Sequence, residues 1–492
     1  MTKIRFAKDL TAALRGAASV SIVAPHALLK RGIARRLLPP ELASLAKAML
    51  ADADPGGLGK VVASYTGSKS PTQLAIASLP DRPARHACPS RSDAIVDCAG
   101  KLPLKVGKAA VVLCLERSEH YLPAANAIAR ALPLYDARSG KNKPGTVTVV
   151  AVDRKGEAIA ADRRVTGTVE ATRWAAGLVD RPAAELSPAD FVVEARKAVR
   201  GLKGVKTSVI SGDDLLRKKL GGIHGVGRAA KVPPRLLVLD YRPARKANGT
   251  VALVGKGIVY DTGGLNLKTG GHMAGMKCDM GGGAAVAGAF RALAGERCDY
   301  RVVALVPLAE NAIGPGSYRP DDILHLHSGK TVEINNTDAE GRLLLADGVS
   351  WAARQVKADL VVDAATLTGA QLLATGKRHA AVVSNRAGLE ELAVRCGYAV
   401  GDPCHPLPFA PEFFQPEFKS AVADMRNSVK DRLNAQTSCA AQFVYSHIQE
   451  LDLPWLHVDL AGPAFPGQRA TGYGVALLSE LVRELTGKAL SR

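Results

Sequence analysis

Apolar strand-like segments that alternate with helix-like segments constrain the fold of this chain more than any other feature of its sequence. Segments rich in Val, Ile and Leu lie at 205–210, 235–240, 250–254, 301–305, 360–363 and 455–459. Such alternation is typical of a mostly parallel sheet that helices cover on both faces. We therefore predict an α/β fold whose larger domain holds a mixed, mostly parallel sheet.

The first third of the chain is predicted to form a separate, smaller α/β domain. Residues 109–115 and 146–152 have the composition of strands, and the segment 122–132 between them has the pattern of a helix. A further helix pattern at 169–179 ends before Pro182, where the chain cannot continue a regular helix. The expected organisation is a domain at 1–163, a connecting helix at 164–180 and a larger domain at 181–492.

Two carboxylates and a guanidinium lie together where a strand pattern at 331–335 gives way to a helix pattern. Asp338 and Glu340 are two residues apart, so their side chains point to the same side if the chain stays extended. The helix pattern begins near Arg342. Carboxylates bind hard or borderline cations, and helix N-termini bind anions. An isolated Asp-x-Glu more often belongs to a solvated turn that contains an ion pair, so a metal site here requires a second cluster.

The second cluster lies upstream and begins at Lys256, which stands between two glycines. Asp261, Lys268 and Asp279 follow at the ends of predicted loops, where the active sites of open α/β sheets collect. The flanking glycines allow a bend that would aim Lys256 and Asp261 at one point. A phosphate-binding loop is the alternative interpretation. It fails because Gly249 is one residue too far from Gly255 and no Ser or Thr follows the lysine.

The two clusters together predict a centre for two divalent cations. The groups concerned are Asp261, Asp279, Asp338, Glu340 and Lys256. Four carboxylates carry too much charge to be buried unpaired, and divalent cations compensate it. Mainly oxygen ligands suit Zn²⁺ or Mn²⁺, while Mg²⁺ and Co²⁺ remain open. Such a pair of ions activates a water and polarises a carbonyl. Lys256 would bind metal as a neutral amine with a lowered pKa, and Lys268 would stay charged to meet a developing oxyanion.

These residues resemble the cytosolic leucyl aminopeptidase family, the two-metal M17 peptidases. Residues 336–343 match the signature of that family, and the lysines and carboxylates of both clusters agree with it in order and spacing. Further agreement runs through 233–236, 363–370 and 455–462. The resemblance covers residues 165–492, about two thirds of the chain, and implies that 181–492 is a catalytic peptidase domain behind a variable N-terminal domain.

The resemblance also implies individual roles. Asp261 and Glu340 would bridge the two metals, Lys256 and Asp279 would complete the tightly held site, and Asp338 would complete the exchangeable one. Arg342 would hold a bicarbonate that acts as general base, which suits a guanidinium at a helix N-terminus. An open metal position would take the free α-amine of a peptide, so that cleavage releases the N-terminal residue. The family also implies a homohexamer.

A pocket for the N-terminal side chain of the substrate is implied in the same way. The matching positions are Met276, Asn336, Thr366, Leu367 and Gly369. An apolar pocket of this kind suits Leu or Met. The departures from the family include Thr269, which replaces a proline that often follows the catalytic lysine, and Asp321, which replaces a usual glycine. His457 and Asp459 have metal-like spacing, but on a buried strand we expect a structural pair.

The net charge of +19 is concentrated in the first part of the chain. Residues 1–170 hold 26 Lys or Arg and 14 Asp or Glu. This excess raises the alternative of a nucleic-acid-binding regulator that retains the peptidase fold. Few aromatic residues and no recognisable DNA-reading motif accompany the charge, so a generally basic surface is the favoured interpretation.

Composition also bears on location. The sequence contains no run approaching the ~18 apolar residues of a membrane-spanning helix. Its eight cysteines form no CxxC pair, which is typical of reduced thiols in a cytoplasmic protein. Residues 1–40 hold eight basic residues and one acid, as in an organelle transit peptide. The strand pattern at 19–24 favours a folded domain instead, so we expect a cytoplasmic protein.

Overall fold

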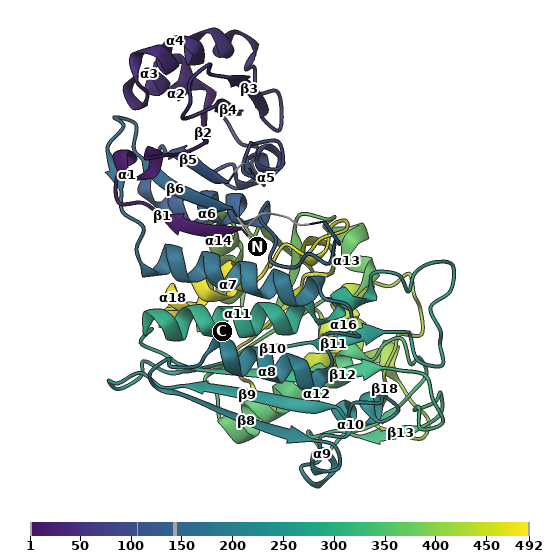
Figure 1. The fold of residues 1–492 in the computed structure, drawn as a ribbon. Coiled ribbons are helices and arrows are strands. Elements are labelled where there is room, and N and C mark those ends of the chain that lie inside the picture. Colours follow the sequence, from purple (N-terminus) through teal and green to yellow (C-terminus); the bar gives the residue numbers. More distant parts are fainter. Residues whose placement is uncertain (1, 106, 141–144, 491–492) are drawn as a thin grey trace. The chain divides into compact units, whose positions relative to one another are not determined.

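A computed structural model describes residues 2–105, 107–140 and 145–490 of the chain. It contains two compact units (Figure 1). The N-terminal unit comprises Met1–Arg173 and Gly397–Pro403, and the second unit comprises Trp174–Cys396 and Cys404–Arg492. The first boundary falls within the long helix α7 (Arg163–Asp180), and the second segment of the N-terminal unit includes the end of α14 (Ala387–Val400).

The N-terminal unit is built on one sheet with the strand order β1-β6-β5-β2-β4-β3, and β7 pairs with β6. Its strands are β1 (Lys3–Phe6), β2 (Ser19–Pro25), β3 (Lys60–Tyr65), β4 (Gln73–Leu79), β5 (Lys108–Cys114), β6 (Thr146–Val152) and β7 (Ala158–Ile159). The pairings among β1, β6, β5, β2 and β4 are parallel, while β3 and β7 add antiparallel edges.

Short helices accompany this sheet. They are α1 (Leu10–Leu14), α2 (His26–Lys30), α3 (Ile33–Leu37), α4 (Pro40–Met49), α5 (Ser92–Ala99) and α6 (Tyr121–Arg130), with single 3₁₀ turns η1 (Leu50–Asp52) and η2 (Ser118–His120). Helices α2 to α4 pack on one face of the sheet and bury apolar side chains of β2, β4 and β5. The predicted strands at 109–115 and 146–152 and the predicted helix at 122–132 are therefore present, within two residues of their expected ends.

The second unit contains a nine-stranded sheet with the order β17-β16-β19-β15-β10-β12-β9-β8, in which β11 also pairs with β12. Its strands are β8 (Val205–Ser211), β9 (Arg235–Tyr241), β10 (Thr250–Gly255), β11 (Gly257–Asp261), β12 (Arg301–Asn311), β15 (Leu360–Ala365), β16 (Ala380–Ser384), β17 (Cys404–Pro406) and β19 (Trp455–Asp459). The central strands β12, β10, β15 and β19 are parallel, and antiparallel partners flank them. The predicted mixed, mostly parallel sheet is confirmed.

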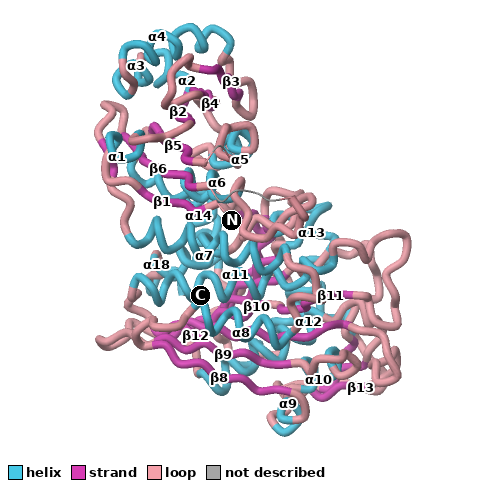
Figure 2. Tube along the Cα trace, in the orientation of Figure 1, coloured by secondary structure: helices cyan, strands magenta, loops and turns pink. Residues whose placement is uncertain are grey.

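Helices cover both faces of this sheet (Figure 2). Helix α11 (Gly281–Glu296) packs on one face with α18 (Val475–Arg483). Helices α10 (Gly221–Gly227), α12 (Gly341–Trp351) and α16 (Gln436–Tyr445) bury Ala252 and Val254 of β10 on the other. The remaining helices are α8 (Pro188–Ala198), α9 (Asp214–Arg217), α13 (Gly369–Ala374), α15 (Pro411–Phe414), α17 (Ala461–Ala464), η3 (Met276–Met280), the π turn η4 (Ala352–Val356), η5 (Gln415–Phe418), η6 (Gln449–Leu451) and η7 (Gly487–Leu490).

A small three-stranded sheet positions the segment 336–340. It consists of β13 (Ile323–His325), β14 (Thr331–Glu333) and β18 (Met425–Arg426). The strand expected at 331–335 ends at Glu333, and the chain turns at residues 337–338 before α12 begins. Asp321 precedes this sheet with a φ of 75°, in the left-handed region that glycine adopts most easily. The backbone conformation thus explains why the resembling family usually has glycine there.

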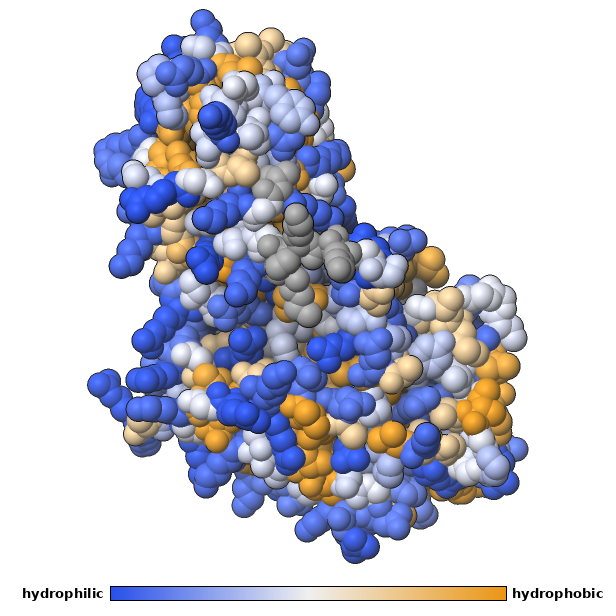
Figure 3. Space-filling view, viewed as in Figure 1, coloured by the Kyte–Doolittle hydropathy of each residue, from blue (hydrophilic) through white to orange (hydrophobic). Residues whose placement is uncertain are grey.

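The surface is mixed in character. On the face shown in Figure 3, hydrophilic residues cover much of the molecule and apolar side chains appear between them. Among the described helices, none combines the length and the apolar composition needed to cross a bilayer. The eight cysteines, all within the described residues, form no disulfide bond.

Candidate metal centre

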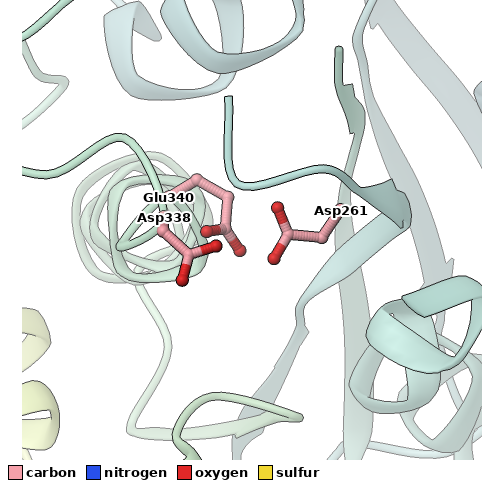
Figure 4. A group of neighbouring side chains, drawn as sticks. All are labelled: Asp261, Asp338 and Glu340. Carbon is pink, nitrogen blue, oxygen red and sulfur yellow. The ribbon is translucent and has the colours of Figure 1, made fainter. Parts of the chain in front are cut away.

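Three carboxylates meet where β11 ends and α12 begins. Asp261 is the last residue of β11, Asp338 lies in the turn after β14, and Glu340 directly precedes α12. One oxygen of each lies within 4.8 Å of the others. Figure 4 shows the carboxylates of Asp338 and Glu340 turned toward that of Asp261. The predicted proximity of Asp338 and Glu340 is present, although the chain between them turns rather than staying extended.

Hydrogen bonds hold Asp261 in a fixed orientation. Its Oδ1 accepts from the backbone N–H of Gly263 and from the side-chain amide of Asn311, both at 2.8 Å. The break between β10 and β11 at Lys256 supplies the bend that the flanking glycines predicted. As a result, Lys256 and Asp261 face one cluster even though they are five residues apart.

The loop that carries Asp338 is tied to the loop that follows Asp261. Thr337 donates from its backbone N–H to Asn266 Oδ1 at 2.7 Å and from its hydroxyl to the Gly263 carbonyl at 2.6 Å. Asn336 Oδ1 accepts from the backbone N–H of Asp338 at 2.9 Å. The buried Tyr318 hydroxyl donates to the Thr337 carbonyl at 2.6 Å. These bonds keep the two loops in register without using the carboxylates.

Two lysines lie among the carboxylates. Lys256 Nζ is 2.8 Å from Asp279 Oδ1 and 2.9 Å from Glu340 Oε1, and it donates to the Thr366 carbonyl at 2.9 Å. Lys268 Nζ is 2.8 Å from Asp261 Oδ2 and 2.6 Å from Asp338 Oδ1. Each lysine thus bridges a different pair of carboxylates.

The cluster carries more negative than positive charge. Burial disfavours the charged form of Lys256, but the surrounding carboxylates outweigh it and raise its pKa. The same balance raises the pKa of Lys268. Burial, reinforced by neighbouring carboxylates, raises the pKa of Asp279 and Glu340. The lowered pKa predicted for Lys256 belongs to a metal-bound amine; the carboxylates alone have the opposite effect.

The donor set fits divalent cations. Asp279 Oδ2 and Glu340 Oε2 are buried and have no hydrogen-bond partner among the described residues. A buried carboxylate oxygen without a partner is costly, and a cation compensates it directly. The remaining ligand atoms are further carboxylate oxygens and one amine, which suits borderline or hard metal ions.

Arg342 is buried beside the cluster in the first turn of α12. Its Nη1 donates to the Asn427 carbonyl at 3.0 Å, and its guanidinium carbon lies 6.0 Å from the centroid of the Phe443 ring. Burial lowers the pKa of Arg342 to about 10. Its buried Nε has no partner among the described residues, so this donor is available to an anion.

A cavity of about 860 Å³ brings every site residue predicted from the sequence onto one surface. The residues are Lys256, Asp261, Lys268, Met276, Asp279, Asn336, Asp338, Glu340, Arg342, Thr366, Leu367 and Gly369. The cavity is also lined by His272, Arg432, Gln436 and Phe465, which no sequence pattern indicated. Thr366, predicted only as a pocket residue, in addition donates from its hydroxyl to Asp279 Oδ1 at 2.9 Å.

Two asparagines that orient the site were missed in the sequence. Asn311 is fully buried and ends β12, and Asn427 follows β18. Asn427 donates from its side chain to the Ala339 carbonyl at 3.2 Å, besides accepting from Arg342. The alignment of β11 with β12 could have indicated Asn311, because residue 311 pairs with residue 261.

His457 and Asp459 lie outside the metal centre. His457 Nδ1 is 2.5 Å from Asp363 Oδ1, and Trp455 donates to the other oxygen of Asp363 at 2.7 Å. Asp459 instead accepts from the Thr368 hydroxyl at 2.7 Å. Both are fully buried. Their metal-like spacing therefore reflects two separate structural hydrogen-bond pairs.

Comparisons with known proteins agree with this geometry. The sequence pattern of the cytosol aminopeptidase family, catalytic domain, matches residues 173–479, and that of M17 aminopeptidase N-terminal domain 2 matches residues 41–141. The chain is 47% identical over 416 residues to the probable aminopeptidase NPEPL1 of Mus musculus, covering 82% of this chain and 78% of that protein.

Solved structures agree over nearly the whole chain. The leucyl aminopeptidase from Trypanosoma brucei in complex with bestatin is 36% identical, with a TM-score of 0.89 over 98% of this chain and 96% of that chain. The bottromycin maturation enzyme BotP in complex with Mn is 29% identical, with a TM-score of 0.78 over 95% of this chain and 99% of that chain.

Proposed function

The chain belongs to the cytosol aminopeptidase (M17) family and is an aminopeptidase, and we propose that it releases N-terminal residues from peptides with the aid of two divalent cations. The observation that carries this proposal is the cluster of Asp261, Asp338 and Glu340 in the same cavity as Lys268 and Arg342. Metal ligands, a cationic donor and an anion-binding guanidinium are the parts that metal-assisted hydrolysis requires.

We assign the cation ligands to Lys256, Asp261, Asp279, Asp338 and Glu340, of which Asp261 and Glu340 would contribute to both sites. The unpartnered oxygens of Asp279 and Glu340 support this assignment. The relative in complex with Mn supports Mn²⁺, and Zn²⁺ suits the same donors. When bound, such ions supply an activated water and polarise the carbonyl of the first peptide bond.

Lys268 is assigned to the oxyanion that develops on this carbonyl. It lines the cavity, and its raised pKa keeps the amine protonated near neutral pH. A positioned cation stabilises negative charge that grows in the transition state more than it stabilises the neutral carbonyl. Lys268 contacts Asp261 and Asp338, and both of these carboxylates would also bind the cations.

Arg342 is assigned to a bicarbonate that acts as general base. Its backbone lies in the first turn of α12, where the helix dipole favours an anion. The carbonyl of Asn427 and the ring of Phe443 fix the guanidinium, and its Nε remains available as a donor. A bicarbonate held there would accept the proton of the attacking water.

The side-chain pocket is assigned to Met276, Asn336, Thr366, Leu367 and Gly369. Met276 and Leu367 are apolar and line the cavity beside the carboxylate cluster. Leu and Met are the substrate side chains that such a surface suits, because both are apolar and flexible enough to fill it. A cationic or acidic N-terminal side chain would lose its hydration on entering this pocket and would gain no charged partner from these five residues.

The assembly, location and domain assignment are proposals as well. We propose a cytoplasmic homohexamer with domains at 1–163 and 181–492 joined by a helix at 164–180. Relatives named probable cytosol aminopeptidase support the location. The large side chains of Phe413, Val422 and Leu433 are 69%, 70% and 95% exposed, which supports an interface between copies. Among the described residues, no feature favours the nucleic-acid alternative over the peptidase.

The decisive experiment compares leucyl-p-nitroanilide with its N-acetylated form before and after removal of metal. We expect chelation to abolish cleavage of the free substrate and Mn²⁺ or Zn²⁺ to restore it, with two ions bound per chain by elemental analysis. The acetylated substrate should stay intact because it lacks a basic α-amine. Equal turnover of the two substrates would contradict the exopeptidase assignment.

A further inference from the structure

The end of helix α7 contacts two segments that line the cavity of the metal centre and lie far apart in the sequence. Asp180, the last residue of α7, is 1% exposed and belongs to the second unit. Its backbone carbonyl accepts from Lys277 Nζ at 2.6 Å, and Lys277 lies in η3 next to Met276. Its carboxylate contacts the segment 465–470, which follows α17. A single buried residue therefore joins the two segments.

The carboxylate of Asp180 has two partners in the segment 465–470. Its Oδ1 accepts from the backbone N–H of Ala470 at 2.9 Å, and its Oδ2 lies 2.9 Å from Nη2 of Arg469. Burial of a carboxylate is costly unless hydrogen bonds or an opposite charge compensate it. The segment therefore cannot move away from α7 without leaving a buried charge unpaired.

The same segment forms part of the cavity wall. Phe465, Gly467 and Gln468 line the cavity, as do Gly275 and Met276 of the other segment. The two segments meet at Phe465, because its Cε1 lies 4.0 Å from the position of a Cβ added at Gly275. The ring of Phe465 thus adds apolar surface beside the segment that carries Met276, a residue assigned to the pocket for the N-terminal side chain.

A separate set of hydrogen bonds closes the base of the segment. The backbone N–H of Thr471 donates to the carbonyl of Ala464 at 3.1 Å, and its hydroxyl donates to the carbonyl of Pro463 at 2.7 Å. Ala464 and Pro463 are buried at the end of α17. These bonds do not involve Asp180. Loss of the Asp180 carboxylate should therefore loosen the segment while its base stays closed and the surrounding fold is retained.

We propose that Asp180 is a positioning residue that holds Phe465 against the pocket for the N-terminal side chain, and that Phe465 contributes to a preference for leucyl over alanyl substrates. The inference rests on the substrate pocket proposed above. Asp180 is absent from the described residues that line the cavity, so its effect on a substrate passes through the segment 465–470. A leucyl side chain reaches further than an alanyl one, so displacement of the ring weakens binding of the leucyl substrate more.

The test compares kcat/KM for leucyl-p-nitroanilide and alanyl-p-nitroanilide with the metal-loaded, full-length protein. We expect Phe465→Ala to lower the leucyl preference about tenfold, because it removes apolar contacts with the longer side chain. Asp180→Ala should lower the preference by a similar factor, mainly through a higher KM for the leucyl substrate, and should keep the metal content of wild type. Because both changes remove the same contact, the double variant should show no further loss.

A control variant separates this effect from a general loss of stability. Val482→Ala removes buried methyl groups from α18, none of whose described residues lines the cavity, so it should keep the leucyl preference. An unchanged preference in Asp180→Ala, additive losses in the double variant, or an equal loss in Val482→Ala would each overturn the inference. So would a wild type that cleaves both substrates without a leucyl preference.

A second variant covers the case in which Asp180→Ala does not fold. Asp180→Asn keeps an acceptor for the N–H of Ala470 but loses the charge that pairs with Arg469. We expect it to lower the leucyl preference about threefold, and an unchanged preference would overturn the inference. Cleavage of neither substrate by wild type would overturn the proposed function and this inference with it, whereas the other negative outcomes contradict the role of Asp180 alone.

Discussion

The side-chain nitrogen of Asn311 donates both to Oδ1 of Asp261 at 2.8 Å and to the carbonyl of Thr337 at 3.1 Å. Asn311 pairs with Asp261 in the register of β11 and β12, and Thr337 precedes Asp338 in the turn. One buried amide therefore joins the two segments that supply the carboxylates of the metal centre. This arrangement fixes their separation independently of any ion.

Asn311→Ala should loosen the centre and weaken the fold together. The change leaves Asp261 Oδ1 with a single backbone donor and leaves the buried Thr337 carbonyl with only the Tyr318 hydroxyl. We expect the free energy of unfolding to fall by about 1–3 kcal/mol. Metal affinity should fall about tenfold or more, because the amide orients a ligand. Denaturant unfolding and metal titration measure the two effects, and the exposed Asn248→Ala is the control.

The two lysines should behave differently when each is removed. Lys256 contacts Asp279 and Glu340 and is fully enclosed, so we expect Lys256→Ala to lower metal stoichiometry or affinity, with partial recovery of turnover in excess metal. Lys268→Ala should keep both ions and lose rate by about 10²–10³-fold, as for the loss of one oxyanion donor. Elemental analysis of the purified variants decides between them. Loss of an ion from Lys268→Ala and not from Lys256→Ala would reverse the assignment.

The strands of the sheet could be predicted because their signal is local. Residues 146–152 and 455–459 become β6 and β19 with unchanged ends, since each is a short run of apolar and β-branched residues. Arg301–Asn311 is longer than the predicted 301–305, because β12 continues past β10 to pair with β11. The additional residues of β12 form a strand because β11 pairs with them. The sequence of the segment does not indicate this partner.

The site was predictable to the extent that its residues lie in two dense clusters. The spacing of Asp338 and Glu340 and the glycines around Lys256 indicated chemistry before any partner was known. Asn311 gave no such signal, because its importance arises from the register of β11 and β12. Contacts between segments about fifty or more residues apart are set by the assembled fold.

Gly341→Ala should displace Lys256 while sparing the fold. An added Cβ at residue 341 would lie 2.5 Å from Lys256 Cε and 2.7 Å from its Nζ. The lysine side chain can move away, so the cost falls on its contacts with Asp279 and Glu340 rather than on the backbone. We expect about tenfold or greater loss of metal affinity in calorimetric titration. Gly295→Ala, a helical glycine whose added Cβ meets nothing within 4 Å, should bind metal like wild type.

Asp321 offers a test of backbone strain away from the metal. Its φ of 75° is unfavourable for any residue with a Cβ by about 1 kcal/mol, and only glycine escapes this cost. Asp321→Gly should therefore be more stable to urea than Asp321→Ala by about 1 kcal/mol. The two variants lose the same carboxylate, so their difference isolates the conformation. Equal stability of the pair would argue against a strained left-handed residue at this position.

The last prediction concerns acid and the buried imidazole of His447. Its Nδ1 lies 2.7 Å from Ser328 Oγ, its ring centroid lies 5.1 Å from that of Phe443, and its Nε2 has no partner among the described residues. Burial lowers the pKa of His447 to about 3, and burial also lowers that of His327 to about 4. Both histidines are therefore neutral in the folded protein at pH 5, whereas the unfolded chain has begun to bind these protons.

Because the unfolded state takes up more protons below the usual histidine pKa, the free energy of unfolding falls as pH drops from about 6.5 toward 3. For His447 alone the loss approaches about 1.4 kcal/mol per pH unit, or about 2 kcal/mol between pH 7 and 5. His447→Gln should reduce stability at pH 7 but flatten this slope, while Gly295→Ala should run parallel to wild type. All three tryptophans lie in the second unit, so their fluorescence during urea unfolding reports on that unit alone. An unchanged slope in His447→Gln would show that this imidazole is protonated in the folded protein, and would contradict the buried neutral state inferred from its packing.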